Sequence, residues 1–204
     1  MELVEYNAAA RLINSYGIKS IESKYVKSAG EAVAFSKGRK IVLKAISNKA
    51  LHKSKAGLIK IDLLSVQEIE GAFRDLQKRA KKFAPYKIIA QKMADKGIEI
   101  IVGGREDAQF GKLLLLGLGG IYVETFRDFA LRVCPITQFD AKQMISQLRS
   151  KKVVTYSGKS EKILEGLLLK ASRLLAENKL SELDLNPVII REDGYDVVDI
   201  RILK

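Results

Sequence analysis

The chain has 204 residues, of which 47% are hydrophobic and 29% are charged, as is typical of a globular protein with a core of its own. Its length permits one bilobed domain or two small domains, and the lack of any low-complexity tract excludes a disordered or fibrous class. The longest apolar run, residues 112–122, is too short to cross a bilayer, and the N-terminus lacks the layout of a signal peptide, so we expect a cytoplasmic protein without membrane attachment.

The formal net charge of +12 indicates an anionic partner. Basic residues are mixed with acidic ones along the chain, and no helix-turn-helix, zinc-finger or aromatic stacking signature occurs, so nucleic acid is not the expected partner. Attraction for nucleotides and attraction for an acidic partner subunit explain the charge equally well.

The first half of the chain alternates between helical and strand periodicity. Gly17 is expected to end the first helix, and Ser28 and Ser65 to cap the next two, with Glu31 at a capping-box position. In chain order, the expected elements are a helix at 7–16, a strand at 22–27, a helix at 28–35, strands at 41–46 and 58–64, and a helix at 65–83.

The second half continues the mixture of strands and helices. The expected elements are strands at 86–93 and 98–103, a buried strand with a glycine-rich turn at 112–121, a strand at 129–136, helices at 140–148 and 160–178, and two closing strands. A short turn at Lys96-Gly97 predicts that the first two strands pair as a hairpin, and Asp140 is expected to cap its helix. The fold class is therefore mixed α/β, with a seam between two lobes at Ala84-Pro85.

The closing strands carry the most informative chemical pattern. Apolar and polar positions alternate on both sides of a turn at Asp193-Gly194, which predicts two antiparallel strands. Asp184 and Asn186 then project from one face, and if Asp199 points the same way, an amide oxygen and a carboxylate stand side by side. Such a pair suits Mg2+, which keeps most of its waters and also contacts nucleotide phosphates. The alternative is an ordinary surface hairpin.

Three further features are consistent with phosphate binding, and each has a structural alternative. The backbone of residues 117–120, Gly-Leu-Gly-Gly, could approach phosphates closely, but a tight turn explains these glycines as well. Lys44 ends a buried strand, where its ammonium must find an anion or extend to solvent. His52, the only histidine, lies among lysines that disfavour its cationic form, so it could accept a phosphoryl group or be a surface residue.

Carboxylates in apolar surroundings mark a second group of candidates. Glu99 lies in an isoleucine-rich strand, where it must be paired, solvated in a cleft or bound to a metal. Gln91 faces it across the expected hairpin turn. Glu124, with Asp128 and Arg132, either forms salt bridges or lines a cleft.

Five motifs occur in the order found in one known family. They are LHKS at 51–54, QKM at 91–93 followed by EIIVG at 99–103, DAQFG at 107–111, GLGGIYVE at 117–124 and ELDLNPV at 182–188. On these motifs nearly the whole chain resembles the ATP-grasp unit of archaeal ADP-forming acyl-CoA synthetases, in particular the separate β subunit of the acetyl-CoA synthetases. The resemblance implies an ATP-grasp fold whose two lobes hold a nucleotide cleft between them. Its expected parts are an N-terminal helix on the C-terminal lobe (1–17), the N-terminal lobe (18–85) and the C-terminal lobe (86–204).

The resemblance also implies residue roles. Lys44 is similar to the strand lysine that holds ATP phosphates, and Asn186 and Asp199 are similar to Mg2+ ligands. His52 is similar to the histidine that carries a phosphoryl group to or from a second subunit. The residues implied to bind the nucleotide elsewhere are Gln91, Lys92 and Met93 at the adenine-binding hinge, and Glu99, Gly119, Gly120 and Glu124 along the cleft.

The implied reaction is that of an acid-thiol ligase. Acyl-CoA, ADP and phosphate give carboxylate, ATP and CoA, reversibly, with Mg2+ and ATP or ADP bound by this chain. CoA and phosphate would be handled with a CoA-binding α subunit in a hetero-oligomer, for which α2β2 is one candidate stoichiometry.

Two departures from the family pattern leave alternatives open. Lys55 stands where the family typically has an acidic residue after the histidine motif, and Leu58 follows Gly57 where a second glycine is typical. Residues 153–159 also lack the usual arginine. The alternatives are another ATP-grasp carboxylate ligase without a histidine relay, and a non-catalytic ATP-grasp regulatory subunit.

Overall fold

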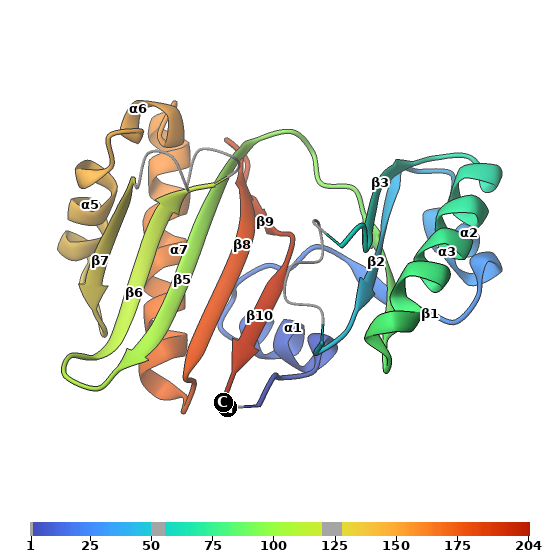
Figure 1. The fold of residues 1–204 in the computed structure, drawn as a ribbon. Coiled ribbons are helices and arrows are strands. Elements are labelled where there is room, and N and C mark those ends of the chain that lie inside the picture. Colours follow the sequence, from blue (N-terminus) through green and yellow to red (C-terminus); the bar gives the residue numbers. More distant parts are fainter. Residues whose placement is uncertain (1, 50–55, 120–127) are drawn as a thin grey trace. The chain divides into compact units, whose positions relative to one another are not determined.

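The computed structural model describes residues 2–49, 56–119 and 128–204. Two compact units make up the chain, one formed by Ile21–Met93 and the other by Met1–Ser20 together with Ala94–Lys204. Each unit is an antiparallel sheet with helices packed against it (Figure 1). The helix at the N-terminus thus belongs to the same unit as the C-terminal strands.

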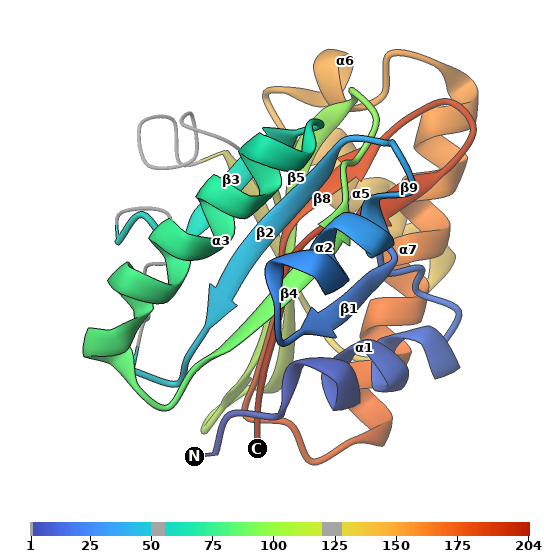
Figure 2. The ribbon, with the colours of Figure 1, turned by 90° about the vertical axis from the view of Figure 1, so that its right-hand side faces the viewer.

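The smaller unit is a four-stranded sheet of order β1-β4-β2-β3. Its elements are β1 (Ser23–Val26), α2 (Ala29–Ser36), β2 (Ile41–Ile46), β3 (Ile59–Leu63), α3 (Val66–Ala80), the 3-10 turn η1 (Lys81–Phe83) and β4 (Lys87–Lys92). Helices α2 and α3 lie on one face of this sheet (Figure 2). Between them and the sheet lies an apolar core that includes Leu43 and Ala90 from the strands and Ile69, Phe73 and Leu76 from α3.

The larger unit is a six-stranded sheet of order β10-β8-β5-β6-β7, with β9 also paired to β8. Its elements are α1 (Tyr6–Ser15), β5 (Ile98–Asp107), β6 (Gly111–Leu118), β7 (Phe129–Val133), α5 (Gln138–Gln147), α6 (Lys151–Val154), α7 (Gly158–Glu177), β8 (Glu182–Ile190), β9 (Tyr195–Val197) and β10 (Ile200–Leu203). Helices α1, α5 and α7 cover one face of the sheet (Figures 1 and 2).

The predicted hairpin between the strands at 86–93 and 98–103 is wrong. Strand β4 pairs with β1 and β2, while β5 pairs with β6 and β8, so the two strands belong to different sheets. The division between the units accordingly falls after Met93 rather than at Ala84-Pro85. The turn signal at Lys96-Gly97 instead marks a close approach of backbones, because a Cβ at Gly97 would lie 2.5 Å from the carbonyl oxygen of Ile190.

Helix starts agree with the sequence in the smaller unit and differ in the larger one. Ser65 caps α3 in a capping box with Glu68, and Ser28 caps α2, as predicted. Helix α5 begins earlier than predicted, because Thr137 is its cap and Asp140 is the third residue of the capping box. Helix α7 likewise begins at Gly158, capped by Ser157.

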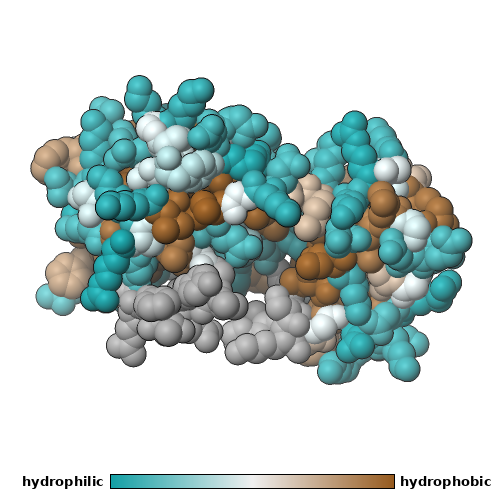
Figure 3. Space-filling model, turned by 90° about the horizontal axis from the view of Figure 1, so that it is seen from above, coloured by the Kyte–Doolittle hydropathy of each residue, from teal (hydrophilic) through white to brown (hydrophobic). Residues whose placement is uncertain are grey.

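The surface visible in Figure 3 is largely polar. Hydrophilic side chains cover most of the side of the molecule seen in Figure 3, with apolar side chains gathered in a few places. Among the described residues, no helix combines the length and apolar character needed to cross a membrane.

Candidate functional site

The face of the six-stranded sheet opposite α1, α5 and α7, which we call the open face, carries the predicted site residues Glu99, Asn186 and Asp199. On β5, the buried Ile100 and Val102 face the helices, so by alternation Glu99, Ile101 and Gly103 lie on the open face. The strand register adds residues on the neighbouring strands, namely Leu113, Leu115 and Gly117 on β6, Phe129, Leu131 and Val133 on β7, Asp184 and Asn186 on β8, Arg201 on β10 and Asp199 immediately before β10.

This face has two chemically different halves. Strands β8 and β10 contribute carboxylates and an amide, whereas β6 and β7 contribute aliphatic side chains and Phe129. Phe129, Leu131 and Val133 are all exposed although they are large and apolar. The half at β8 and β10 therefore suits a polar, cation-binding group of a ligand, and the half at β6 and β7 suits an apolar group of the same ligand.

The oxygen-rich half is centred on Asn186 and Asp199. Ile200 on β10 lies opposite Leu185 on β8, so the next pair along the ladder is Asn186 with Asp199. The backbone N–H of Asn186 donates to the carbonyl oxygen of Asp199 at 3.3 Å. Because directly opposed residues of an antiparallel pair project to the same face, the amide and the carboxylate stand side by side. The antiparallel pairing of the two closing segments, which the alternating sequence predicted, is present.

A β-bulge shapes this part of β8. Ile100 of β5 lies opposite Val188, but Val102 lies opposite Leu185, so Asn186 and Pro187 together oppose one residue of β5. Bulges bend a strand and re-aim side chains, and they are common beside functional sites. Here Asn186 is exposed, while Leu185 and Val188 on the two sides of the bulge are buried.

The donors on this face fit Mg2+. An amide oxygen and a carboxylate are hard ligands, and Mg2+ is usually held by one or two such protein groups, with waters and phosphates completing its shell. Within the described ranges, no three or more His, Cys, Asp or Glu residues form a group that could hold a metal by themselves. A cation at Asn186 and Asp199 would therefore keep ligand positions for phosphate oxygens and water.

Glu99 and Gly119 are neighbours across β5 and β6. The N–H of Gly119 donates to the carbonyl oxygen of Glu99 at 2.7 Å, and a Cβ at Gly119 would lie 2.8 Å from the carbonyl carbon of Glu99. This glycine is thus required by close backbone approach, and its N–H is already used within the sheet. The side chain of Glu99 is exposed, in keeping with a carboxylate in contact with solvent.

Lys44 and Gln91 share a face of the smaller sheet. Gln91 lies opposite Val42, and Lys44 lies opposite Ile89, which makes the two polar residues diagonal neighbours on β2 and β4. Both lie on the face away from α2 and α3, since the alternate residues Leu43 and Ala90 belong to the helix-facing core. Lys44 is only 3% exposed and Gln91 is fully buried. A buried ammonium requires a compensating anion or acceptor.

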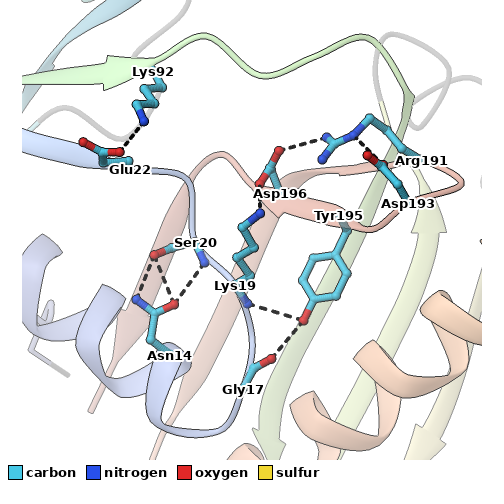
Figure 4. Close-up of polar contacts among 10 residues, drawn as sticks. All are labelled: Asn14, Gly17, Lys19, Ser20, Glu22, Lys92, Arg191, Asp193, Tyr195 and Asp196. Atoms are coloured by element: carbon cyan, nitrogen blue, oxygen red, sulfur yellow. Dashed lines mark hydrogen bonds and ion pairs between the residues drawn. The ribbon is translucent and has the colours of Figure 1, made fainter.

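The rest of the expected hinge lies at the end of β4. Lys92 forms an ion pair with Glu22, and this pair holds the pKa of the Glu22 carboxyl below its ordinary value (Figure 4). Met93 is exposed, and its N–H donates to the carbonyl oxygen of Lys40 at 3.2 Å. Three other predicted residues, His52, Gly120 and Glu124, lie outside the described residues.

An ion-pair network beside β9 was not predicted. Asp196 is buried between Arg191 Nη1 at 2.8 Å and Lys19 Nζ at 3.6 Å (Figure 4). Burial would lower the pKa of the Arg191 guanidinium, but Asp196 and Asp193 raise it above its ordinary value. The opposite charges flanking the β8–β9 turn are the sequence signal for this pairing.

Tyr195 fixes the same segment from the other side of β9. Its hydroxyl donates to the carbonyl oxygen of Gly17 at 3.2 Å, and burial raises its pKa (Figure 4). Asn14 accepts from the N–H of Ser20 at 3.0 Å. Tyr195 and Lys19 thus attach the segment that follows α1 to β9, and the Asn14–Ser20 contact holds the same segment to α1.

Comparison with known proteins gives matches over the whole chain. The model of the ATP-grasp domain family matches residues 2–203. The β subunit of acetate–CoA ligase (ADP-forming) I from Pyrococcus furiosus is 34% identical over 207 residues, covering 96% of this chain and 89% of that protein.

Solved structures agree. One is acetyl-coenzyme A synthetase 1 of Ca. Korarchaeum cryptofilum in complex with coenzyme A, Ca-AMPCP and HgCl+, which is 37% identical, has a TM-score of 0.91 and covers 99% of this chain and 93% of that one. Another form of that enzyme, with coenzyme A and Mg-AMPPCP and a phosphohistidine segment pointing towards the nucleotide-binding site, is 35% identical, has a TM-score of 0.83 and covers 98% of this chain and 92% of that one. The chain therefore belongs to the ATP-grasp family and is a homologue of the β subunits of ADP-forming acetate–CoA ligases.

Proposed function

We propose that this chain is the nucleotide-binding β subunit of an ADP-forming acyl-CoA synthetase. It would bind Mg2+ with ADP or ATP and pass a phosphoryl group through His52 to or from a CoA-binding α subunit. The observation that carries the proposal is the side-by-side placement of Asn186 and Asp199 on the open face of a chain that matches such β subunits along its whole length.

The described residues support separate roles in nucleotide binding. Asn186 and Asp199 would hold the divalent cation, which neutralises charge on the polyphosphate. Lys44 presents a buried ammonium to a phosphate, where low surrounding polarity strengthens the attraction. Gln91, Lys92 and Met93 would bind the adenine, and the remaining residues proposed to line the nucleotide are Glu99, Gly119, Gly120 and Glu124. The N–H of Gly119 is engaged with Glu99, so any contribution from Gly119 is the close approach that its missing side chain permits.

The phosphoryl transfer itself is assigned to His52. Neighbouring lysines disfavour the cationic form of an imidazole, and a neutral imidazole nitrogen can accept a phosphoryl group and later return it. Such a relay would join a nucleotide site to a separate thioester site without releasing an acyl phosphate to water. CoA, phosphate and the acyl group would be met largely by the α subunit of a hetero-oligomer such as α2β2.

The test is to purify the chain with its native partner and to supply Mg2+, ADP, phosphate and a panel of acyl-CoA thioesters. The proposal predicts ATP formation with at least one thioester. It also predicts that His52→Asn lowers turnover by about 1,000-fold or more, as for loss of a covalent nucleophile, while Mg-ADP binding is retained.

Other outcomes favour the two alternatives. Turnover that survives His52→Asn would indicate an ATP-grasp carboxylate ligase without a histidine relay. Lys55, which follows the histidine motif where an acidic residue is typical, favours this alternative. Failure of the wild-type chain to bind ADP or ATP in the presence of Mg2+ would indicate a non-catalytic regulatory subunit.

A further inference from the structure

Most glycines of the six-stranded sheet have a structural reason for lacking a side chain. A Cβ at Gly104 would lie 2.3 Å from Cδ1 of Leu175 on α7, and a Cβ at Gly117 would lie 3.3 Å from the carbonyl oxygen of Asp128. Gly111 begins β6 with φ of 76°, a backbone conformation that side chains disfavour. In each of these cases a larger residue would clash or would be strained.

Among the described residues of its unit, nothing gives Gly103 such a reason. Its φ is not in the left-handed region, and a Cβ there would lie 3.6 Å from the carbonyl oxygen of Leu183 and 3.9 Å from Cβ of Leu115, which are ordinary van der Waals separations. Glycine in the middle of a strand weakens a sheet, because it loses more backbone entropy on folding and has no side chain to pack. The described residues would therefore accept the methyl group of alanine at this position without a clash.

The position of Gly103 connects it to the candidate site. It lies on the open face, paired with Asp184 on β8 and with Leu115 on β6. Neighbouring strands are about 4.8 Å apart, and positions two residues apart along a strand are separated by about 7 Å, so Gly103 lies beside Asp184 and about 8 Å from Asn186. Asp184 in turn lies opposite Arg201 on β10.

We propose that Gly103 is a clearance position for the nucleotide: the polyphosphate with its cation passes over the bare backbone between Asp184 and Leu115, and a side chain at residue 103 would occupy that space. A strand glycine without a structural reason often marks a close approach by a ligand. The ligand group that belongs beside the oxygens of β8 and β10 is the cation-bound polyphosphate rather than the adenine. This inference rests on the proposed function, and it makes Gly103 a residue that selects the ligand by leaving space.

The test compares Gly103→Ala and Gly103→Val with the wild-type full-length chain, alone and with its partner. Melting temperature reports on the fold, and calorimetric titration with Mg-ADP and with AMP reports on the site. Both variants should melt at the wild-type temperature or above it, since alanine and valine suit a strand better than glycine. We expect the dissociation constant of Mg-ADP to rise at least tenfold in Gly103→Val and less in Gly103→Ala, with a smaller change for AMP.

Two control variants separate clearance from structural damage. Gly166→Ala on α7, where a Cβ would meet nothing within 4 Å, should raise the melting temperature and leave Mg-ADP binding unchanged. Gly104→Ala, on the other face of the same strand, should lower the melting temperature because it meets Leu175. A Gly103 series that loses melting temperature as Gly104→Ala does would mean that the glycine is structural, and the clearance proposal would fail.

The remaining outcomes are also decisive. If the wild-type chain binds Mg-ADP and Gly103→Val binds it equally well, the clearance proposal is wrong while the proposed function stands. Equal losses for Mg-ADP and AMP would overturn the assignment of this space to the polyphosphate. If the wild-type chain does not bind Mg-ADP at all, the proposed function fails and the clearance role fails with it.

Discussion

The carboxylate of Asp128 caps the backbone at Ser150, 22 positions later in the chain: one oxygen accepts the N–H of Ser150 at 2.8 Å, and the other accepts the N–H of Arg149 at 2.8 Å. Asp128 precedes β7, and residues 149 and 150 connect α5 to α6. This one side chain therefore holds the start of an edge strand against the connection between two helices.

Asp128→Ala should destabilise the chain. Two backbone donors lose a charged acceptor, and a loss of about 1–3 kcal/mol in the free energy of unfolding is expected. Chemical denaturation at pH 7 measures the change. A value indistinguishable from wild type would show that water replaces the carboxylate at both N–H groups.

The same contact should make stability depend on pH. Burial alone would raise the pKa of Asp128, but hydrogen bonds donated by Ser150 and Arg149 lower it below its ordinary value. A lowered folded-state pKa means that the stabilisation is complete above the unfolded-state pKa of about 3.9 and is lost as the pH falls through the folded-state pKa. The difference in unfolding free energy between wild type and Asp128→Asn should therefore be constant from pH 7 to about pH 5 and should shrink at about pH 3 and below. A difference that grew on acidification would contradict the assignment.

Asp199→Asn tests the cation site. The variant keeps the shape of the side chain and removes its charge, so the dissociation constant for ADP with Mg2+ present should rise by about tenfold or more, equivalent to at least about 1.4 kcal/mol. With EDTA in place of Mg2+, wild type and variant should bind alike. Asp193→Asn in the β8–β9 turn is the matched control, because it removes the same charge outside the proposed site.

Gly119→Ala should lower stability, in contrast to the Gly103 variants. Its Cβ would lie 2.8–2.9 Å from the carbonyl group of Glu99, and backbone atoms of a central strand cannot move aside cheaply. Overpacking of this kind typically costs about 1–3 kcal/mol, which denaturant titration can resolve. An unchanged midpoint would show that the backbone at Gly119 shifts to accept the methyl group.

Thr137→Ala tests the start of α5. The hydroxyl of Thr137 accepts the N–H of Asp140 at 3.2 Å, and loss of such a cap costs about 1 kcal/mol. Ser146→Ala serves as control, since this hydroxyl only donates to the carbonyl of Gln143 within the helix. Equal effects of the two substitutions would mean that the cap contributes nothing beyond an ordinary side-chain hydrogen bond.

The sequence was most informative where one face of an element is buried. In β8, alternation placed Leu183 and Leu185 toward the core and Asp184 and Asn186 away from it, and this is the observed arrangement. Such a pattern is reliable because a slip of one residue would expose every apolar side chain of the strand. The caps Ser28 and Ser65 were equally predictable, because each lies immediately before a run of helical periodicity.

Pairing between distant segments could not be predicted in this way. Periodicity identified the strands that became β4 and β5 but not their partners, since a short polar link is compatible both with a hairpin and with a crossing between two sheets. The start of α5 was misjudged because Thr137 and Asp140 are both good capping residues, and only the observed backbone shows which one is outside the helix. The contact of Asp128 with residues 149 and 150 has no local signal at all.

The bulge in β8 also fixes the length of the chain around the candidate cation site. Leu185 and Val188 are both buried, although residues three positions apart in a regular strand lie on opposite faces. Val197 and Ile200, which face them, are also three positions apart and both buried. Deleting one residue between Leu185 and Val188 would restore regular pairing with β5, but it would leave Val198 and Asp199 opposite a single residue of β8. A homologue that shortens β8 here is therefore expected to lose a residue from the facing 198–199 segment as well, and an aligned set of relatives can test this coupling of the two lengths.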